Sequence, residues 1–165
     1  MTLDDQAAGP GEVEVTIEVI TGEGDLRAIF MDVADDSLLA GMIASGEDVT
    51  EAVFAASSVI DLGQGANVNG NGPCPCDLGV EFGTPGIGSD DIQLTTFVLS
   101  HTTENLTLAL FEGEAIMVRA TSVGDEFSRE NSAKTAAIVP EPSVEALLAS
   151  GLALLAVRRR NARAA

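Results

Sequence analysis

The sequence has no tryptophan, no tyrosine, six phenylalanines, one histidine and two cysteines. Sugar-binding sites usually stack rings on Trp or Tyr, so their absence weakens the case for a lectin or a glycosidase. A catalytic constellation is hard to assemble around the single histidine, His101, and no serine has the G-x-S-x-G surroundings of a hydrolase nucleophile. The glycine-rich stretch 83–88 lacks the Lys-Ser/Thr ending of a phosphate-binding loop. We therefore expect a non-enzymatic protein with a core of Val, Ile, Leu and Ala.

Basic residues are also scarce, and half of them lie at one end. Residues 1–139 hold 24 of the 26 Asp and Glu but only 4 of the 8 Lys and Arg, which gives them a net charge of −20. Such a surface repels nucleic acid and anionic lipid head groups. A partner is expected to be cationic, a neutral sugar, or bridged by divalent cations. Charge that serves solubility alone is the simpler alternative.

The last 26 residues, from Pro140 onward, have an order found nowhere else in the chain. A Pro-Glu-Pro triplet is followed by an apolar run, 146–157, and then by four arginines. As a helix, those 12 residues would span roughly 18 Å, against about 30 Å of bilayer hydrocarbon. The run is apolar all round, which suits lipid better than a half-exposed surface, although a C-terminal helix packed on the domain is the alternative. An arginine cluster stays on the cytoplasmic side, so the larger part of the chain is expected across the membrane.

This order resembles the PEP-CTERM sorting signal of exported bacterial proteins. The resemblance implies that an exosortase, a membrane-embedded cysteine protease-transpeptidase, recognises the tail and removes it. It implies a transient inner-membrane anchor, followed by delivery to the cell surface or to an exopolysaccharide, biofilm-type matrix. The sorting motif would comprise Pro140, Glu141, Pro142, Arg158, Arg159 and Arg160. Members of this family carry a secretory signal, whereas residues 1–15 have neither a basic nor an apolar region, so the signal peptide is expected to be missing here.

The chain divides into five predicted parts. Residues 1–12 are a flexible lead-in, 13–136 a β-sandwich ectodomain, 137–143 a linker with the Pro-Glu-Pro motif, 144–157 a short transmembrane helix and 158–165 a basic cytoplasmic tail. The ectodomain shows about eight short strand patterns with few helix signals, which favours an antiparallel sandwich or jelly roll. The patterns cover 13–19, 26–33, 49–55, 58–62, 79–82, 92–100, 106–111 and 115–123, while 37–44 is ambiguous and 124–139 leads out.

The ectodomain also resembles a group of uncharacterised PEP-CTERM ectodomains, a likeness that brings no known activity. The segments that carry it are 24–33, the Gly/Asn loop running into 73–81, 86–92 and 128–134.

Cys74-Pro75-Cys76 is the only thiol pair in the chain. Export to an oxidising compartment favours a disulfide, and the flanking Gly72 and Pro73 favour the tight bend that it needs. Such a bridge would be a local clip on the long loop 63–76. A metal or redox role is the alternative, although two thiols are too few ligands and the spacing is not C-x-x-C.

Acidic residues in glycine-rich loops are candidate calcium ligands, because calcium takes six to eight oxygens from carboxylates and loop carbonyls. The candidates are Asp77, Asp90 and Asp91, with Asn67 and Asn69 as further oxygen donors. Solvated loop charge is the competing interpretation. The first functional hypothesis is thus a structural or interaction protein of the cell surface. A calcium-dependent glycan- or matrix-binding module is the second, and a hydrolase is the third.

Overall fold

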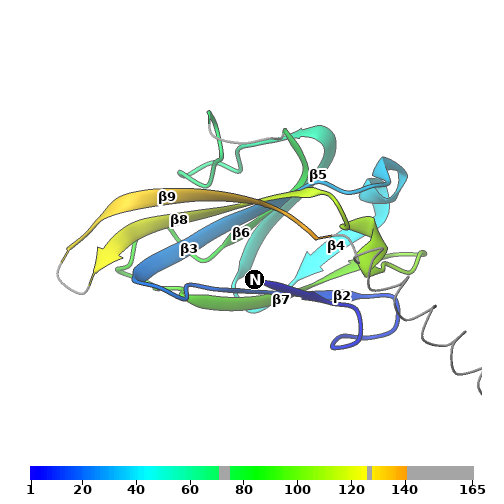
Figure 1. Cartoon of the computed structure of the whole chain (residues 1–165), viewed down its shortest axis with the longest axis horizontal. Coiled ribbons are helices and arrows are strands. Elements are labelled where there is room, and N and C mark those ends of the chain that lie inside the picture. Colours follow the sequence, from blue (N-terminus) through cyan, green and yellow to red (C-terminus); the bar gives the residue numbers. More distant parts are fainter. Residues whose placement is uncertain (71–74, 126–127, 141–165) are drawn as a thin grey trace, which may run out of the picture.

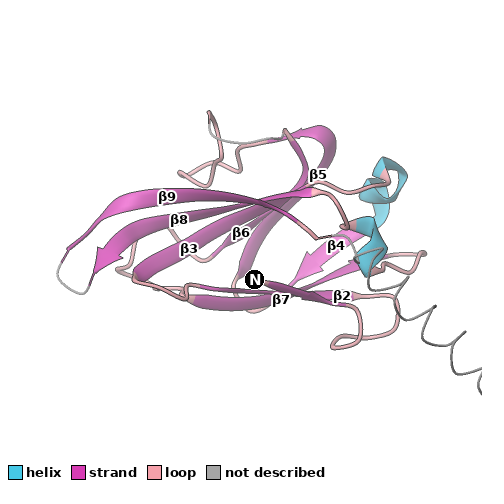
Figure 2. Cartoon of the chain, in the orientation of Figure 1, coloured by secondary structure: helices cyan, strands magenta, loops and turns pink. Residues whose placement is uncertain are grey.

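The computed structural model describes residues 1–70, 75–125 and 128–140, which form two antiparallel sheets with short 3₁₀ helices at one end (Figures 1 and 2). The predicted mainly β, antiparallel fold is confirmed. Within the described residues, no helix has the length and apolar character needed to cross a bilayer. The predicted transmembrane helix, 144–157, lies outside them.

The smaller sheet has four strands in the order β1-β2-β7-β4. The strands are β1 (Thr2–Asp4), β2 (Val13–Glu18), β7 (Leu94–His101) and β4 (Met42–Ser45). In β2, Val13, Val15 and Ile17 are buried while the residues between them are not. This confirms the period-2 pattern of a strand with one face on a core.

The larger sheet has five strands in the order β5-β6-β3-β8-β9. The strands are β5 (Val49–Val59), β6 (Cys76–Phe82), β3 (Glu23–Met31), β8 (Ala115–Asp125) and β9 (Ser128–Ile138). Every residue of β6 is buried, whereas no residue of β9 is fully buried. The larger sheet is therefore buried at β6 and largely exposed to solvent at β9, its edge strand.

Two hydrophobic clusters flank the larger sheet, because alternate residues of its strands face opposite sides. Ile29 and Met31 of β3 pack with Val15 and Phe97 of the smaller sheet, in the cluster between the sheets. Ala28 and Phe30 face the other way, where Val59, Leu62, Ala66, Val68 and Met117 form a second cluster.

The second cluster is covered by residues 60–68, of which 60–62 are the end of a predicted strand and 63–68 belong to the predicted loop 63–76. Leu62 N donates to Ala66 O at 2.9 Å, and Val68 N donates to Ile60 O at 2.9 Å. Gly63 and Gly65 adopt positive φ, which lets the chain double back on the sheet. The loop is thus a packed cover for one face of the larger sheet.

Several predicted boundaries differ from the structure. Residues 106–111, predicted as a strand, contain the 3₁₀ turn η2 (Leu108–Leu110), and the ambiguous 37–44 divides between η1 (Asp36–Gly41) and β4. The segments 49–55 and 58–62 are largely one long strand, β5, with Ser57 at φ 47° beside an irregularity in its pairing.

The ends of the domain also differ from the prediction. The lead-in 1–12 contains β1, in which Thr2 pairs with Thr16. Residues 124–139, predicted to lead out, contain β9. Its Ile138 pairs with Ala115, and Val139 N donates to Glu114 O at 3.0 Å.

Candidate functional site

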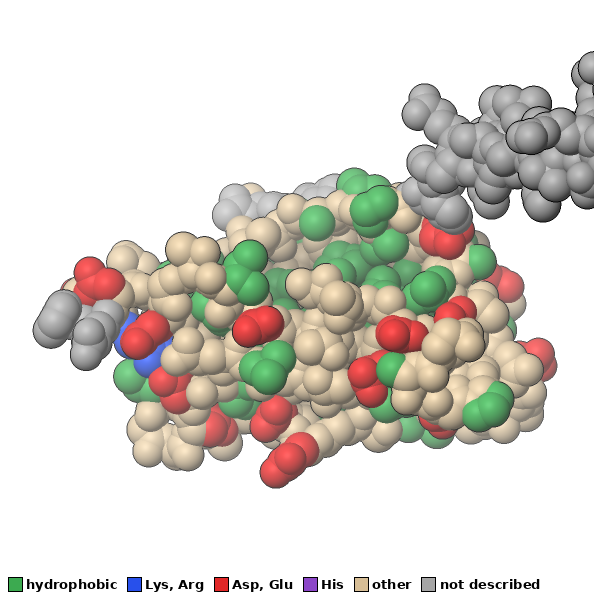
Figure 3. Space-filling model, turned by 60° about the horizontal axis from the view of Figure 1, so that its bottom comes forward, with side chains coloured by type: hydrophobic (Ala, Val, Ile, Leu, Met, Phe, Trp, Pro, Cys, Tyr) green, Lys and Arg blue, Asp and Glu red, His purple; other side chains and the backbone are tan. Residues whose placement is uncertain are grey.

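The most prominent candidate site is an apolar groove between the open edge of the larger sheet and strands β1 and β2. It consists of two adjoining hollows of about 450 and 380 Å³ that share Met1, Ile116 and Ala137. Hydrophobic side chains gather in a hollow of this face, and acidic side chains are scattered around it (Figure 3). We call these two hollows together the apolar groove.

The groove floor is built by alternation along the paired strands β8 and β9. Ile116 pairs with Ala137, Val118 with Thr135 and Ala120 with Ala133. All six residues line the second hollow. Directly opposed residues share one face of a sheet, so this stripe follows from register alone. Its small residues on β9 leave the space that Ile or Leu would fill.

The groove stays open because the smaller sheet covers only part of the larger one. Buried residues of β2 and β7 pack over β3 and β6, whereas β9 supplies no buried residue to that core. Leu3, Val19 and Val118 only partly close the gap. The groove is therefore an accessible apolar surface on a domain that is otherwise rich in acidic residues.

One end of the groove is acidic. Glu18 and Glu23 line it, and Arg129 lies beside Glu23 with an Nη1–Oε2 distance of 3.5 Å. Arg129 also donates to both carboxylate oxygens of Asp91, at 2.6 and 2.7 Å. These bonds lower the pKa of Asp91 and raise the pKa of Arg129.

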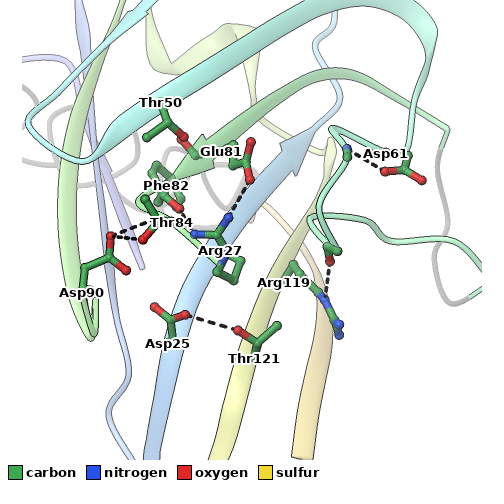
Figure 4. Close-up of polar contacts among 12 residues, drawn as sticks. Asp25, Arg27, Thr50, Asp61, Glu81, Phe82, Thr84, Asp90, Arg119 and Thr121 are labelled. Atoms are coloured by element: carbon green, nitrogen blue, oxygen red, sulfur yellow. Dashed lines mark hydrogen bonds and ion pairs between the residues drawn. The ribbon is translucent and has the colours of Figure 1, made fainter. Parts of the chain in front are cut away.

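A buried charged pair, shown in Figure 4, joins β3 to β6. Arg27 is 1% exposed, and its Nη2 lies 2.6 Å from Oε1 of Glu81. Its Nη1 donates to the Phe82 carbonyl. Burial raises the pKa of Glu81, against the lowering effect of Arg27. The pair is fully enclosed, so we assign it a role in holding β3 to β6.

Asp25 lies two residues before Arg27, and its carboxylate is fully buried as well. Ile92 N donates to its Oδ1 and Thr121 Oγ1 donates to its Oδ2, both at 3.3 Å. Burial raises the pKa of Asp25, and nearby Asp90 adds to the rise. This carboxylate ties β3 to β8 and to the segment before β7.

All four basic residues of the region 1–139 contact other parts of the fold. Besides Arg27 and Arg129, Arg119 donates to Gly65 O at 3.1 Å, and Lys134 Nζ donates to Asn69 O at 2.8 Å and to Asn67 Oδ1 at 3.1 Å. The last two anchor the covering loop to β8 and β9. The cations therefore serve contacts within the fold, and most charged side chains on the face shown in Figure 3 are acidic.

The predicted calcium ligands bind protein donors and lie apart. Asp77 is buried, accepting from Val33 N at 2.9 Å and from Ser57 N at 2.7 Å. Asp90 Oδ2 accepts from Thr84 N and Thr84 Oγ1, and its Oδ1 is buried with no hydrogen-bond partner in the described part. Asp77 is near the start of β6 and Asp90 contacts Gly83 just past its end, roughly 20 Å away along the strand.

Among residues 1–70, 75–125 and 128–140, no three His, Cys, Asp or Glu side chains are grouped so that they could hold a metal ion. Asn67 and Asn69 serve the covering loop through Lys134. Asp90 and Asp91 are adjacent in sequence, but their side chains have different partners. Asp91 accepts from Arg129, while Asp90 accepts from Thr84.

The cysteine and histidine candidates lie away from the groove. Cys76 is fully buried at the start of β6 and is not a free thiol. Cys74 lies outside the described residues, so the proposed pairing stays a prediction. His101 accepts from Thr103 N at 3.1 Å and Glu104 N at 2.9 Å through Nδ1, which caps the turn after β7.

A separate acidic cluster lies where β3 ends. Burial raises the pKa of Asp32 to about 6, and the neighbouring carboxylates of Asp77, Glu114 and Asp36 add to the rise. Asp32 and Asp36 are close in sequence, whereas Asp77 reaches the cluster from β6.

Two sets of residues escaped the sequence inspection. The β9 side of the groove was missed because Ala133, Thr135 and Ala137 are small and carry no strong strand signal. Arg27 did have a signal: it is a lone cation inside the apolar run 26–33. The sorting residues Glu141, Pro142 and Arg158–Arg160 lie outside the described part, while Pro140 lines one end of the groove.

Comparison with known proteins adds no relative: no protein-family model matches this chain, no curated protein matches it, and no solved structure matches it.

Proposed function

We propose that this chain is an exported, non-enzymatic protein of the cell surface or exopolysaccharide matrix, sorted through its C-terminal tail. The observation that carries the proposal is the order of the tail: Pro140-Glu141-Pro142, an apolar run and the arginines 158–160. In this proposal an exosortase-type enzyme is the processing partner, and the inner membrane holds the protein only until the tail is removed.

Charge supports a temporary rather than a permanent association with the membrane. The tail from Pro140 has four basic and two acidic residues, while residues 1–139 carry −20. Once the tail is removed, an anionic bilayer repels what remains. The apolar run is also short, which suits a segment that is removed after sorting better than a permanent membrane anchor.

In this proposal the described part is the exported cargo, a β-sandwich of jelly-roll type. A scaffold whose cations are all engaged internally presents carboxylates outward, which suits cationic or neutral partners in a hydrated matrix. The apolar groove gives it one surface for a specific contact.

The test is to express the chain behind a secretory signal, in a host with an exosortase and in the same host lacking that enzyme. With the enzyme, the intact mass of the delivered protein should show loss of the arginine-containing end. Without it, the full chain should stay in the inner-membrane fraction. Delivery of the untrimmed chain in both hosts would contradict the proposal.

Motif variants sharpen this test. Replacing Pro140 and Pro142 with alanine, or Arg158–Arg160 with glutamine, should block trimming. Asn161→Ala, placed among the arginines but outside the motif, is the matched control and should be trimmed normally. Equal trimming of all variants would mean that trimming does not depend on the tail motif, and it would contradict the proposal.

A further inference from the structure

We propose that, in water, the apolar segment 144–157 of this chain's own tail lies in the apolar groove. The inference goes beyond the sorting proposal, because it concerns the protein outside a membrane. It rests on where the described chain ends, on the length of the segment and on the charges at the far end of the groove.

The chain leaves the described part at one mouth of the groove. β9 ends at Ile138, and Ile138, Val139 and Pro140 all line the first hollow. Only three residues, 141–143, then separate Pro140 from the apolar segment. This short connection keeps the segment at a high effective concentration beside the groove.

The groove and the segment have similar lengths. From Ile116 to Val123 the groove floor follows eight residues of β8, whose seven residue-to-residue steps cover about 23 Å of strand. The fourteen residues 144–157 would span about 21 Å as a helix. Apart from Glu145 and Ser150 the segment is apolar, and so is most of the groove lining, so the contact would remove hydrophobic surface from water on each side.

The charges match at the far end of the groove. A segment entering beside Pro140 and running back along β9 would carry Arg158–Arg160 toward Glu18 and Glu23. Glu23 pairs with Gly124, which places Asp125 near the same end. Arg129 is the cation placed at this end, and it already binds Asp91. Carboxylates therefore outnumber cations where the arginines would arrive.

A consequence is that the groove and a bilayer compete for one segment. When the segment is in a membrane or has been removed, the groove is open to another apolar ligand.

The experiment uses the purified full chain in detergent-free buffer. The chain has no Trp and no Tyr, so Leu152→Trp places a single fluorescent reporter in the middle of the segment. If the segment lies in the groove, the reporter emits as in an apolar environment, and acrylamide quenches it severalfold less than in the urea-unfolded chain. Emission and quenching equal to those of the unfolded chain would overturn the proposal.

Neighbouring variants on β9 give a matched control. Ala137 lines the groove, whereas Ala136 pairs with Met117 and faces the other side of the sheet. Both are exposed, so either can become glutamate without burying a charge in the core. Ala137→Glu should release the reporter to water by placing a carboxylate in the groove, and Ala136→Glu should leave it unchanged. Equal effects, or none, would overturn the proposal.

Circular dichroism of both variants must show the same β content and the same cooperative melting. Light scattering then distinguishes the source of the segment. A reporter that stays protected at monomer mass on dilution supports docking within one chain. Protection that requires a dimer or larger assembly would overturn it, because the groove would then hold the tail of another copy.

Discussion

Strands β6 and β9 belong to the same sheet, yet one is buried along its whole length and the other is exposed along most of it. β6 lies between the smaller sheet on one face and the covering loop 60–68 on the other. On its groove face, β9 is covered neither by the smaller sheet nor by the covering loop. Coverage by other segments, rather than membership of the sheet, therefore decides which strand carries the core and which offers a surface.

The composition of the two strands matches this contrast. β6 contains Leu78, Val80 and Phe82, which point into the core between the sheets. β9 contains small and polar residues such as Ser132, Ala133 and Thr135. β6 has to stabilise the fold, while β9 is free to serve a contact. The predictions below test this division, beginning with the largest expected effect.

Removing Arg27, the buried cation of β3 that pairs with Glu81 of β6, should cause the largest loss. Arg27→Ala leaves Glu81 buried without its partner, which should lower the free energy of unfolding by about 3–5 kcal/mol, as measured by urea denaturation. Lys134→Ala on β9 removes a partly exposed contact and should cost less than about 1 kcal/mol. Equal losses would contradict the contrast between the two strands.

A double variant separates the effect of the two charges on stability from the effect of the space that the two side chains fill. Arg27→Met combined with Glu81→Met removes both charges and keeps apolar bulk, so the double variant should recover most of the stability lost in Arg27→Ala. A double variant as unstable as the single one would mean that the guanidinium bond to the Phe82 carbonyl dominates.

Adding one carbon to β6 should cause an intermediate loss. A Cβ at Gly79 would lie 2.9 Å from Val59 Cγ1 and 3.2 Å from Leu62 Cδ1, so the covering loop would have to shift. Gly79→Ala should therefore cost about 1–3 kcal/mol, measured by thermal unfolding. The matched change on β9, Ser132→Ala at an exposed position, should cost almost nothing.

A smaller effect is expected from pH. The pKa of Asp32, about 6, lies above its usual value of 3.8. Between these two values the folded state holds a proton that the unfolded state has lost, so this group's contribution to stability falls as pH rises from 4 to 6. After allowance for solvent screening, Asp32→Asn should add less than about 1 kcal/mol at pH 7.

The comparison that checks this is the stability difference between Asp32→Asn and wild type at pH 4 and pH 7. The gain should be present at pH 7 and absent at pH 4. A gain of equal size at both pH values would mean that the substitution acts through packing rather than charge.

Calcium should have the smallest effect. Asp77 and Asp91 already bind protein donors, and Asp90 lies apart from Asp77. We expect millimolar calcium to shift the melting temperature no more than magnesium at equal ionic strength. A shift specific to calcium that is lost in Asp90→Asn would revive the calcium-dependent module.

The sequence was informative where large apolar residues alternate. Val13, Val15 and Ile17 predicted β2, and the Thr- and Phe-containing run at 92–100 predicted β7. It misled where apolar residues are buried without a strand: Leu106, Leu110 and Phe111 fill the core from a 3₁₀ turn and its flanks. Burial depends on distant segments, and the local pattern does not record them.

The candidate site was less predictable than the fold. The groove arises from the offset between two sheets and from small residues at Ala133 and Ala137, neither of which gives a local pattern. The proposed ligands Asp77, Asp90 and Asp91 looked alike as acidic loop residues. Their roles diverge because Val33, Thr84 and Arg129 reach them from other parts of the chain.

Amide hydrogen exchange of the full chain tests the contrast between β6 and β9 most directly. The amides of β6 should exchange only through global unfolding. Those of β9 should exchange by local opening, faster by at least about tenfold, which corresponds to 1.4 kcal/mol. Ala137→Glu should speed β9 further by displacing the tail, and Ala136→Glu should not. Equal protection of β6 and β9, unaffected by either variant, would contradict the account.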